Sequence, residues 1–514
     1  MSDNQTTDDL SQVLRHRREK LDAIIERGMQ PFAYNFTPTS TTAATITSFE
    51  AVECAEALGE NGHGERVALG GRIVGWRDMG RSVFAHVEDG HGRVQLYFRK
   101  NVIGEESFES LSLLDVSDWI GAEGPTFRTR TGEVTIQVES WTLLTKSLRP
   151  LPFGKVETDP ETGERKVYGG FQDQEVRYRQ RYADLAVHPE IRDVFRTRSR
   201  VITELRRFLD DEGFLEVETP VLQPLYGGAS AKPFVTHHHF LDQTMYLRIA
   251  DELYLKRLIV GGLDRVYEIS KDFRNEGLSK VHNPEFTMLE WYQAFSDYED
   301  QMDLVERMVL YILDTVVGER VIRVGGDVIP VTVPFRRLGL VSGLSDALGQ
   351  DVHEMSEGDL RAKAKELDLQ ELDGAGRGKL IDKLFGELVE PGLMEPTFVI
   401  DHPKELSPLA KRHRNDPRLT ERFEMYIGGA EIFNAFSELN DPIDQRERFE
   451  AQSTLRDAGD EEAQRIDDDY IRALEYGMPP TGGVGMGVDR FVMMLTGQTS
   501  IRDVILFPIL RNEE

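Results

Sequence analysis

The sequence predicts an α+β protein in which a small barrel of short strands precedes a larger domain of helices and strands. The chain has 514 residues, more than one hydrophobic core normally organises. Between residues 66 and 147, apolar residues recur with a period of two and glycine-containing turns separate the runs, which indicates short strands. After residue 172, long helical patterns alternate with strands to the end of the chain.

The first 64 residues predict a helix and a linker that precede the barrel. Residues 8–27 place leucine and isoleucine among charged side chains and end before Gly28, as expected for an amphipathic helix. Residues 35–64 are rich in Thr, Gly and Ala and predict a loose linker with a short helix inside. We therefore place the barrel at residues 65–150.

The segment that follows the barrel predicts a hinge at residues 151–185, and the larger domain then occupies residues 186–514. Within this domain, a helix expected around residues 189–212 ends at Gly213 and precedes the strand FLEVETPVL. Residues 345–395 are helical and charged, and they predict an insertion. The run VETDPETGERKVYGG in the hinge predicts a surface excursion.

The composition excludes several classes of protein. Hydrophobic residues make up 39% and charged residues 29% of the chain, a ratio that rules out wholesale disorder. The single cysteine, Cys54, allows neither an internal disulfide nor a thiolate metal site, so a reducing compartment is expected. No stretch approaches the roughly 20 apolar residues of a membrane span, and the N-terminus lacks the apolar core of a signal peptide. We expect a soluble, cytoplasmic protein.

The net charge of −29 argues against a polyanionic partner, but it is spread unevenly. Residues 65–100 hold seven basic and four acidic side chains, and residues 175–207 hold nine arginines and five acids. Residues 441–475 instead carry twelve acids and five arginines. A basic barrel that bears Phe84 suits single-stranded nucleic acid, whose binding would weaken with salt, although solvated strand faces explain the charges equally well.

The first segment with a chemical pattern is YEISKDFRNEGLSKVHNPEFTMLEWYQAF, residues 267–295. Arg274 and Glu276 stand two apart at the end of a predicted strand, so they share a face, and the chain returns through His282 to a second strand with Phe286. Such a hairpin can hold a nucleotide, with the arginine on phosphate and the aromatic ring on the base. A surface hairpin with unrelated charges explains the same pattern.

The second segment is RFEMYIGGAEIFNAFSELNDP, residues 422–442. A two-residue glycine turn at 428–429 would pair Tyr426 with Glu431 and place Glu424 on the same face. Two converging carboxylates favour a cation, and ligands that are all oxygen favour magnesium. Asn434, Phe436 and Glu438 would then lie on the opposite face, and all could serve one site only if the strand bulges or bends near Phe433.

The third segment is TGGVGMGVDRFVMMLTGQTSIRDVILFP, residues 481–508. Gly483, Gly485 and Gly487 alternate along a predicted strand, where missing side chains let a ligand approach the backbone, and Arg490 opens an apolar helix. A packing strand without function is the alternative, but it would not need three spaced glycines. A dinucleotide-binding loop is disfavoured because no βαβ unit follows.

In this order, the three segments resemble the motifs of class II aminoacyl-tRNA synthetases, subclass IIb, and most closely the bacterial lysyl-tRNA synthetase family. The resemblance covers nearly the whole chain, from RREKLDAIIERGMQPF through GFLEVETPVL, FRNEG and HNPEFTMLEWY to GVGMGVDR and SIRDVILFP. It implies an N-terminal OB-fold barrel that binds the anticodon, followed by a catalytic domain with an antiparallel sheet flanked by helices. It also implies a homodimer formed through motif one, whose strand Pro220 closes.

The resemblance implies ATP-dependent activation of L-lysine to lysyl-adenylate and its transfer to the 3′-hydroxyl of the terminal adenosine of tRNA(Lys). Arg274 and Arg490 would be catalytic, with Arg274 on the α-phosphate and the lysine carboxylate. Arg490 and Phe286 would sandwich adenine. Glu276 would read the adenine edge, His282 and Asn283 would contact the triphosphate, and Mg²⁺ would bind Glu424 and Glu431.

For lysine, the resemblance implies that Gly228 and Glu252 hold the α-amino group. The side-chain pocket would be formed by Glu290, Tyr292, Asn434, Phe436 and Glu438. In the barrel, the anticodon-binding positions would be Arg77, Phe84, Gln95 and Glu133.

Two alternatives differ in ways that the sequence can test. A lysyltransferase paralogue that modifies a protein would share the catalytic domain but lack the barrel, which is present here. A catalytically silent regulator would have damaged catalytic positions, yet Arg274, Glu276, Glu424, Glu431 and Arg490 are all present.

Overall fold

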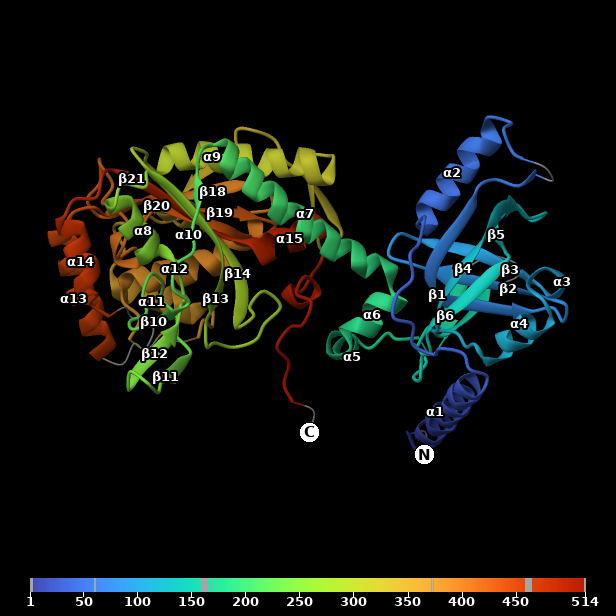
Figure 1. Cartoon of the computed structure of the whole chain (residues 1–514). Coiled ribbons are helices and arrows are strands. Elements are labelled where there is room, and N and C mark those ends of the chain that lie inside the picture. Colours follow the sequence, from blue (N-terminus) through green and yellow to red (C-terminus); the bar gives the residue numbers. More distant parts are fainter. Residues whose placement is uncertain are drawn as a thin grey trace. The chain divides into compact units, whose positions relative to one another are not determined.

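Residues 1–172 and 173–514 form two separate units of the computed structural model shown in Figure 1. The structure describes residues 3–59, 62–158, 165–168, 170–370, 372, 374–457 and 465–512. Most of the expected surface excursion in the hinge, residues 159–164 and 169, lies outside the described residues, and so do residues 458–464 of the acidic stretch.

The first unit contains a barrel of five strands, as the sequence predicts. The strands follow the order β1-β2-β3-β5-β4, and β4 pairs back with β1, which closes the ring. Only the pairing of β3 with β5 is parallel. Alternate apolar side chains such as Leu69, Ile73 and Leu96 point inward and form the core. The strands are β1 (Arg66–Asp78), β2 (Ser82–Glu88), β3 (Arg93–Arg99), β4 (Trp119–Arg128) and β5 (Val134–Val138), and β6 (Ser140–Thr145) extends β4 outside the ring.

Helices and a small hairpin complete this unit. The expected N-terminal helix is confirmed as α1, and the helix inside the linker is α2, whose first turn is capped by the hydroxyl of Thr41. Gly28 follows α1 with a φ of +71°, which favours glycine at the end of a helix. The elements are α1 (Asp3–Glu26), α2 (Thr42–Cys54), α3 (Lys100–Ile103), α4 (Glu105–Ser110), β7 (Lys155–Thr158) and β8 (Arg165–Tyr168).

An eight-stranded sheet dominates the second unit, in the order β17-β18-β19-β20-β21-β14-β13-β9. The expected antiparallel sheet is confirmed for the six strands from β18 to β13, while the outer pairs β17–β18 and β13–β9 are parallel. The sheet strands are β9 (Leu215–Glu216), β13 (Arg265–Phe273), β14 (Glu285–Ala294), β17 (Arg336–Gly339), β18 (Thr397–Pro403), β19 (Leu419–Ile427), β20 (Ala430–Ser437) and β21 (Thr481–Gly487).

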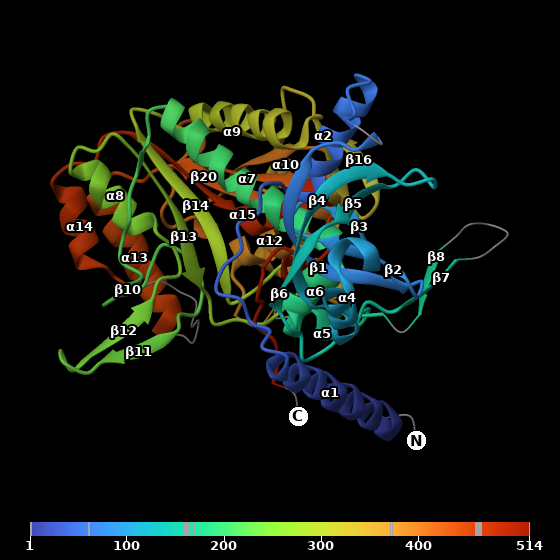
Figure 2. The same cartoon turned by 45° about the vertical axis from the view of Figure 1, so that its right-hand side comes forward.

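Helices cover one face of this sheet, and Figure 2 shows α7 and α9 side by side across it. With α15 they bury Trp291, Phe433 and many aliphatic side chains, which provides the main hydrophobic stabilisation. Pro189 opens α7, Gly213 follows it with a φ of +80°, and Asp297 with Asp300 forms a capping box at α9. The helices are α5 (Gln174–Arg179), α6 (Arg181–Val187), α7 (Pro189–Asp211), α8 (Glu252–Val260), α9 (Tyr298–Ile312), α13 (Pro442–Asp457), α14 (Asp468–Glu475) and α15 (Val488–Thr496).

The strand expected over residues 214–222 is much shorter than its sequence suggests. Only Leu215–Glu216 and Leu222–Gln223 pair, as β9 and β10, and Pro220 between them cannot donate to a sheet ladder. β10 belongs to a separate three-stranded sheet with β11 (Val235–His238) and β12 (Gln243–Leu247). Leu215, Leu222 and Val235 in these strands are exposed.

The expected helical insertion is present and has its own hydrophobic cluster, which includes Leu344, Leu384 and Phe385. Its helices are α10 (Leu340–Leu348), α11 (Glu357–Glu366) and α12 (Arg377–Leu388), so it begins slightly before the expected boundary. Val399 of β18 and Tyr426 of β19 belong to the same cluster, so the insertion packs against the sheet. A two-stranded hairpin, β15 (Val321–Val324) with β16 (Asp327–Pro330), precedes it.

Candidate active site

One cavity of the second unit is lined by every residue that the resemblance assigned to catalysis or to ATP, lysine or metal binding. Its volume is about 840 Å³, large enough for a nucleotide together with a small second substrate. The assigned residues that line it are Gly228, Glu252, Arg274, Glu276, His282, Asn283, Phe286, Glu290, Tyr292, Glu424, Glu431, Asn434, Phe436, Glu438 and Arg490.

The alternation of β14 explains how one strand serves both the core and the cavity. Leu289 and Trp291 pack into the hydrophobic core under the helices, whereas Glu290 and Tyr292 line the cavity on the other face. β21 pairs with β14 on one side and β20 on the other. The cavity wall is therefore built from the three adjacent strands β14, β21 and β20, with β21 contributing mainly glycines.

A β-bulge in β20 brings the two faces of the second segment into one site, which is the condition that the sequence left open. Tyr426 pairs with Glu431, as predicted from the glycine turn, but Met425 pairs with Phe433 and Glu424 with Asn434. Ile432 is therefore the extra residue, next to the position expected to bend. As a result, Glu424, Glu431 and Asn434 all line the cavity.

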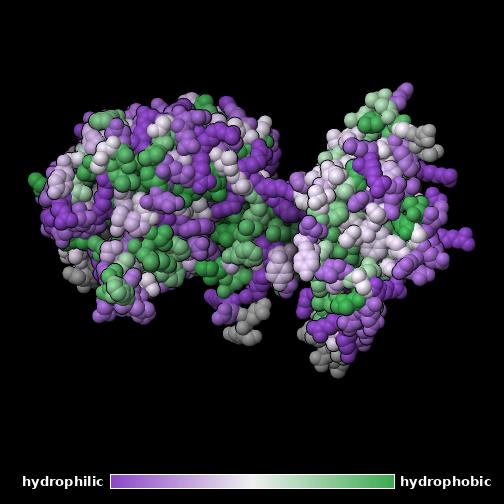
Figure 3. All heavy atoms as spheres, viewed as in Figure 1, coloured by the Kyte–Doolittle hydropathy of each residue, from purple (hydrophilic) through white to green (hydrophobic). Residues whose placement is uncertain are grey.

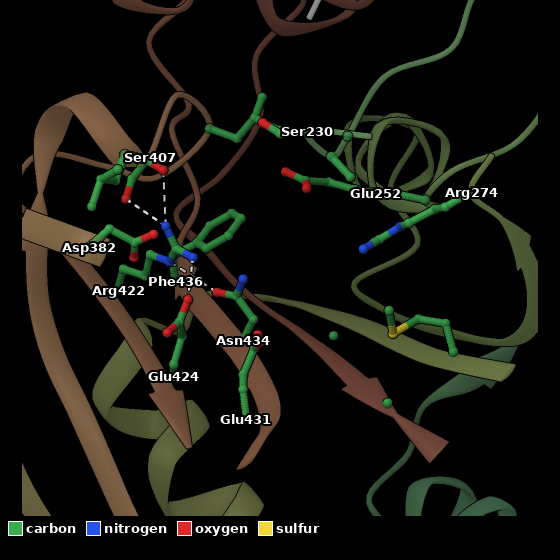
Figure 4. Close-up of a pocket in the computed structure, with 18 of the residues that line it drawn as sticks. Ser230, Glu252, Arg274, Asp382, Ser407, Arg422, Glu424, Glu431, Asn434 and Phe436 are labelled. Carbon is green, nitrogen blue, oxygen red and sulfur yellow. Dashed lines mark hydrogen bonds and ion pairs between the residues drawn. The ribbon is translucent and has the colours of Figure 1, made fainter. Parts of the chain in front are cut away.

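The Glu424 carboxylate lies beside a basic side chain that sequence reasoning missed. Arg422 Nη2 is 2.5 Å from Glu424 Oε1, and its other nitrogens donate to Asn434 and Ser407, as Figure 4 shows. Burial alone would raise the pKa of Glu424, but Arg422 and other neighbours outweigh it, so the pKa lies below the usual value. Arg422 could have been predicted from the sequence, because it stands two residues before Glu424 on a strand and therefore points to the same face.

Glu431 has the opposite electrostatic character. Burial and the charge of Glu424 raise the pKa of Glu431 to about 7, although Arg490 opposes the shift. Glu424 makes the negative charge of Glu431 costly, and a divalent cation bound by the oxygens of both carboxylates would relieve this cost. The residues present therefore fit the expected magnesium site.

Arg490 connects the second and third segments to the loop of the first. Its Nη1 donates to the backbone oxygen of Glu431 at 3.0 Å, and its Nη2 lies 3.1 Å from His282 Nε2. Burial and the positive charge of Arg490 lower the pKa of His282, so a neutral imidazole accepts this hydrogen bond. Behind it, Asp489 accepts from Arg198 of α7 and from the backbone of Thr287, which fixes the start of α15.

Arg274 and its neighbours form the opposite end of the cavity. The guanidinium of Arg274 lies 5.1 Å from the ring centroid of Phe286, and Figure 4 shows it extending into the cavity with Glu252. Glu276 is exposed in the loop after β13. Asn283 is buried, and within the described residues no donor reaches its Oδ1. This set leaves charged and polar groups available to a nucleotide.

In a third part of the cavity, buried carboxylates lie close to the backbone of β21. A Cβ on Gly483 would lie 2.0 Å from Glu438 Oε1 and 2.4 Å from Tyr292 Cε1, so this glycine makes room for both side chains. Tyr292 donates to Glu290 at 2.9 Å. Burial and the nearby Asp272 and Glu252 raise the pKa of Glu290 to about 8, and burial also raises the pKa of Glu438.

The excess acid in this region is partly balanced by Arg248. Asp251, Asp272 and Glu290 have carboxylate oxygens within 4.8 Å of one another. Arg248 ion-pairs with Asp251 at 2.9 Å and with Asp272 at 3.4 Å. Of the three carboxylates, Glu290 is the one that lines the cavity. Asp251, Asp272 and Arg248 were not predicted from the sequence.

In the barrel, the four residues expected to contact an anticodon lie on the same face of the strands, and Gln95 among them is buried. Arg77 pairs with Phe84 across β1 and β2, and the ring of Phe84 stacks on Tyr97 with centroids 4.5 Å apart. Gln95 Nε2 donates to Glu133 Oε2 at 2.7 Å. Tyr97 continues the aromatic surface and was missed, although it stands two residues after Gln95 on β3 and therefore points to the same face.

Comparison with known proteins places both units in described families. Residues 173–511 match the family of tRNA synthetases class II (D, K and N), and residues 67–144 match the OB-fold nucleic acid binding domain. The chain is 48% identical over 512 residues to a lysine–tRNA ligase of Pelotomaculum thermopropionicum, which covers 99% of this chain and 96% of that protein.

Two further relatives agree over similar lengths. A lysine–tRNA ligase of Carboxydothermus hydrogenoformans is 47% identical over 504 residues, covering 98% of this chain and 99% of the relative. A lysine–tRNA ligase of Moorella thermoacetica is 48% identical over 499 residues and covers 97% of each chain. Separately, none of the helices in the described residues is long and apolar enough to cross a bilayer.

Proposed function

The chain belongs to the class II tRNA synthetases of the D, K and N group, and from this premise we propose that it activates L-lysine with ATP and ligates it to tRNA(Lys). In the first step, the lysine carboxylate attacks the α-phosphorus of ATP and pyrophosphate leaves. In the second, the 3′-hydroxyl of the terminal tRNA adenosine attacks the acyl carbon and AMP leaves. The alternative of a lysyltransferase paralogue without a barrel is not supported, because residues 67–144 match the OB-fold nucleic acid binding domain.

The first step needs alignment and charge stabilisation rather than a protein nucleophile. Arg274 would hold the α-phosphate and the lysine carboxylate in line, and Phe286 and Arg490 would hold adenine between them. Glu276 would accept from the adenine amino group, while His282 and Asn283 would contact the triphosphate. Glu424 and Glu431 would hold Mg²⁺, which when bound neutralises triphosphate charge and polarises the phosphorus.

The single observation that carries lysine as the substrate is the group of buried carboxylates on one side of the cavity. Glu252, Glu290 and Glu438 are all buried and line it. A buried carboxylate is costly unless a cation pairs with it, and lysine brings two ammonium groups. Gly228 and Glu252 would hold the α-amino group, and Glu438 would face the ε-ammonium, with Glu290, Tyr292, Asn434 and Phe436 around the chain.

Lysine-dependent exchange of pyrophosphate into ATP by the purified chain tests this function. We expect exchange with L-lysine and magnesium, and no comparable exchange with any other common amino acid. Aminoacylation of a total tRNA pool with each amino acid checks the second step. Exchange with a different amino acid would overturn lysine as the substrate, and complete absence of exchange would support the catalytically silent alternative.

Binding of tRNA by the barrel predicts an effect that is separate from chemistry. Replacing Phe84 by alanine removes one stacking surface, which is worth roughly 1–3 kcal/mol per base, so the KM for tRNA(Lys) should rise about 5- to 150-fold. Pyrophosphate exchange needs no tRNA and should stay at the parent rate. Equal loss in both assays would mean that Phe84 serves the fold rather than the anticodon.

We also propose a cytoplasmic homodimer. Several exposed apolar side chains lie in motif one and in the β11–β12 hairpin: Leu215, Val221, Leu222, Val235 and Phe240. Figure 3 shows apolar surface over the lower part of the second unit. Apolar groups gathered in this way favour burial against a second protein surface. The single, exposed Cys54 suits a reducing compartment.

A further inference from the structure

A lysine of the protein itself lies behind the group of buried carboxylates. Lys256 is on α8, one turn after Glu252, and its side chain is 0% exposed. A lone buried ammonium is among the costliest groups to place in a protein interior. Its position therefore needs partners, and both of its ionic partners are residues of the proposed substrate pocket.

The ammonium of Lys256 bridges the two carboxylates that would receive the two ends of the substrate. Its Nζ ion-pairs with Glu252 Oε1 and with Glu438 Oε2. It also lies 5.2 Å from the ring centroid of Phe436 and 5.9 Å from that of Tyr292. Burial disfavours the charged form, but Glu252 and Glu438 outweigh it and raise the pKa of Lys256, so the group stays positive.

The Glu438 carboxylate keeps an oxygen for another partner. Lys256 uses one oxygen of Glu438, and within the described residues no hydrogen-bond donor reaches the other, Oε1. That oxygen lies where a side chain on Gly483 would be, on the cavity wall. Most buried acceptors in proteins have a donor, so this oxygen can accept from an ammonium group of a bound substrate.

The charges of the three carboxylates that would surround lysine balance those of the substrate only when Lys256 is counted. Glu252, Glu290 and Glu438 can supply three negative charges. The two ammonium groups of lysine cancel two of them, while the substrate carboxylate faces Arg274. When all three carboxylates are ionised, Lys256 cancels the third negative charge, so these carboxylates, Lys256 and the two ammonium groups balance, as a poorly solvated site favours.

We propose that Lys256 is a positioning residue for the substrate: its ammonium fixes Glu252 and Glu438 relative to each other and leaves the pocket with two negative charges for a diammonium amino acid. This inference rests on the proposed function, since it concerns the same pocket. Lys256 would touch neither ATP nor the reacting atoms. Its removal should therefore change lysine recognition without changing ATP binding.

Lys256→Met, which keeps an unbranched side chain one atom shorter and removes its charge, tests the proposal in pyrophosphate exchange. We expect the KM for L-lysine to rise roughly tenfold or more, because the unbalanced carboxylates take up a proton or separate. The KM for ATP should remain within about twofold of the parent value. Lys256→Gln retains hydrogen-bond donors but no charge, so it should raise the KM for L-lysine by a smaller factor. This variant replaces Lys256→Met in the test if the methionine variant does not fold.

Lys146→Met is the matched control. Lys146 is also a fully buried lysine between two carboxylates, Asp115 and Asp118, but it belongs to the barrel unit. The Lys146→Met substitution should lower the melting temperature and leave the KM for L-lysine unchanged.

Three results would decide against Lys256 as a positioning residue. A lysine KM within about threefold of the parent in both Lys256 variants would overturn the inference. Equal rises in the KM values for lysine and ATP would instead indicate a structural role and overturn it too. Absence of lysine-dependent exchange in the unmodified chain would overturn the proposed function, and the inference with it.

Discussion

Replacing Arg274 by alanine should lower the rate of lysine-dependent pyrophosphate exchange by about a thousandfold or more, comparable with removal of an arginine that stabilises a transferring phosphoryl group. Arg274 follows β13 at the mouth of the hairpin, and its guanidinium reaches the cavity beside Phe286. The reaction has no protein nucleophile, so alignment and charge at the α-phosphate supply most of the rate enhancement. Loss of the residue that would contact both reactants therefore affects kcat as well as both KM values.

Arg265→Ala is the matched control for this variant. Arg265 begins the same strand at its opposite end, is exposed, and donates to the backbone oxygen of Glu212. Its removal takes the same charge from the same hairpin and should leave exchange near the parent rate. If Arg265→Ala and Arg274→Ala lost similar activity, the charge of the hairpin rather than the position of Arg274 would be responsible.

The register of the β19–β20 hairpin illustrates how far the sequence could be taken. Two adjacent glycines predicted the pairing of Tyr426 with Glu431, and this pairing is confirmed. Strand alternation alone placed Asn434 on the opposite face from Glu424 and Glu431, and only a bulge or a bend near Phe433 could bring them together. A bulge depends on how a strand pairs with its neighbours, here β19, so the local sequence could state the condition but not decide it.

Partners that come from distant parts of the chain could not be predicted. Glu252 and Lys256 stand four apart, which in such an acidic chain is typical of an exposed helical pair. The same lysine also contacts Glu438 on another element, and only the folded structure shows that both ion pairs are buried. The strand expected at motif one failed for a related reason, because its length depends on partner strands rather than on its own apolar residues.

Replacing Glu438 by glutamine should impair the use of lysine far more than the binding of ATP. Glu438 is buried beside Tyr292 and Gly483, and the amide would leave the substrate ε-ammonium without its charged partner. Loss of one member of a buried charge pair costs about 2–5 kcal/mol, which corresponds to roughly a 30- to several-thousand-fold loss in kcat/KM for lysine. Measured in exchange assays, the KM for ATP should stay within about threefold of the parent, because nothing at the Arg274 and Phe286 end changes.

The substitution also tests whether charge or shape selects lysine, since glutamine keeps the size of glutamate. Glu421→Gln is the matched control: Glu421 is buried on β19 of the same sheet but pairs with Arg414 and accepts from Ser437. That variant should lower thermal stability and leave the lysine KM unchanged. Equal losses for lysine and ATP in Glu438→Gln would mean that Glu438 supports the sheet. The partner of the ε-ammonium would then have to be Glu290, which accepts from Tyr292 and lines the same wall of the cavity.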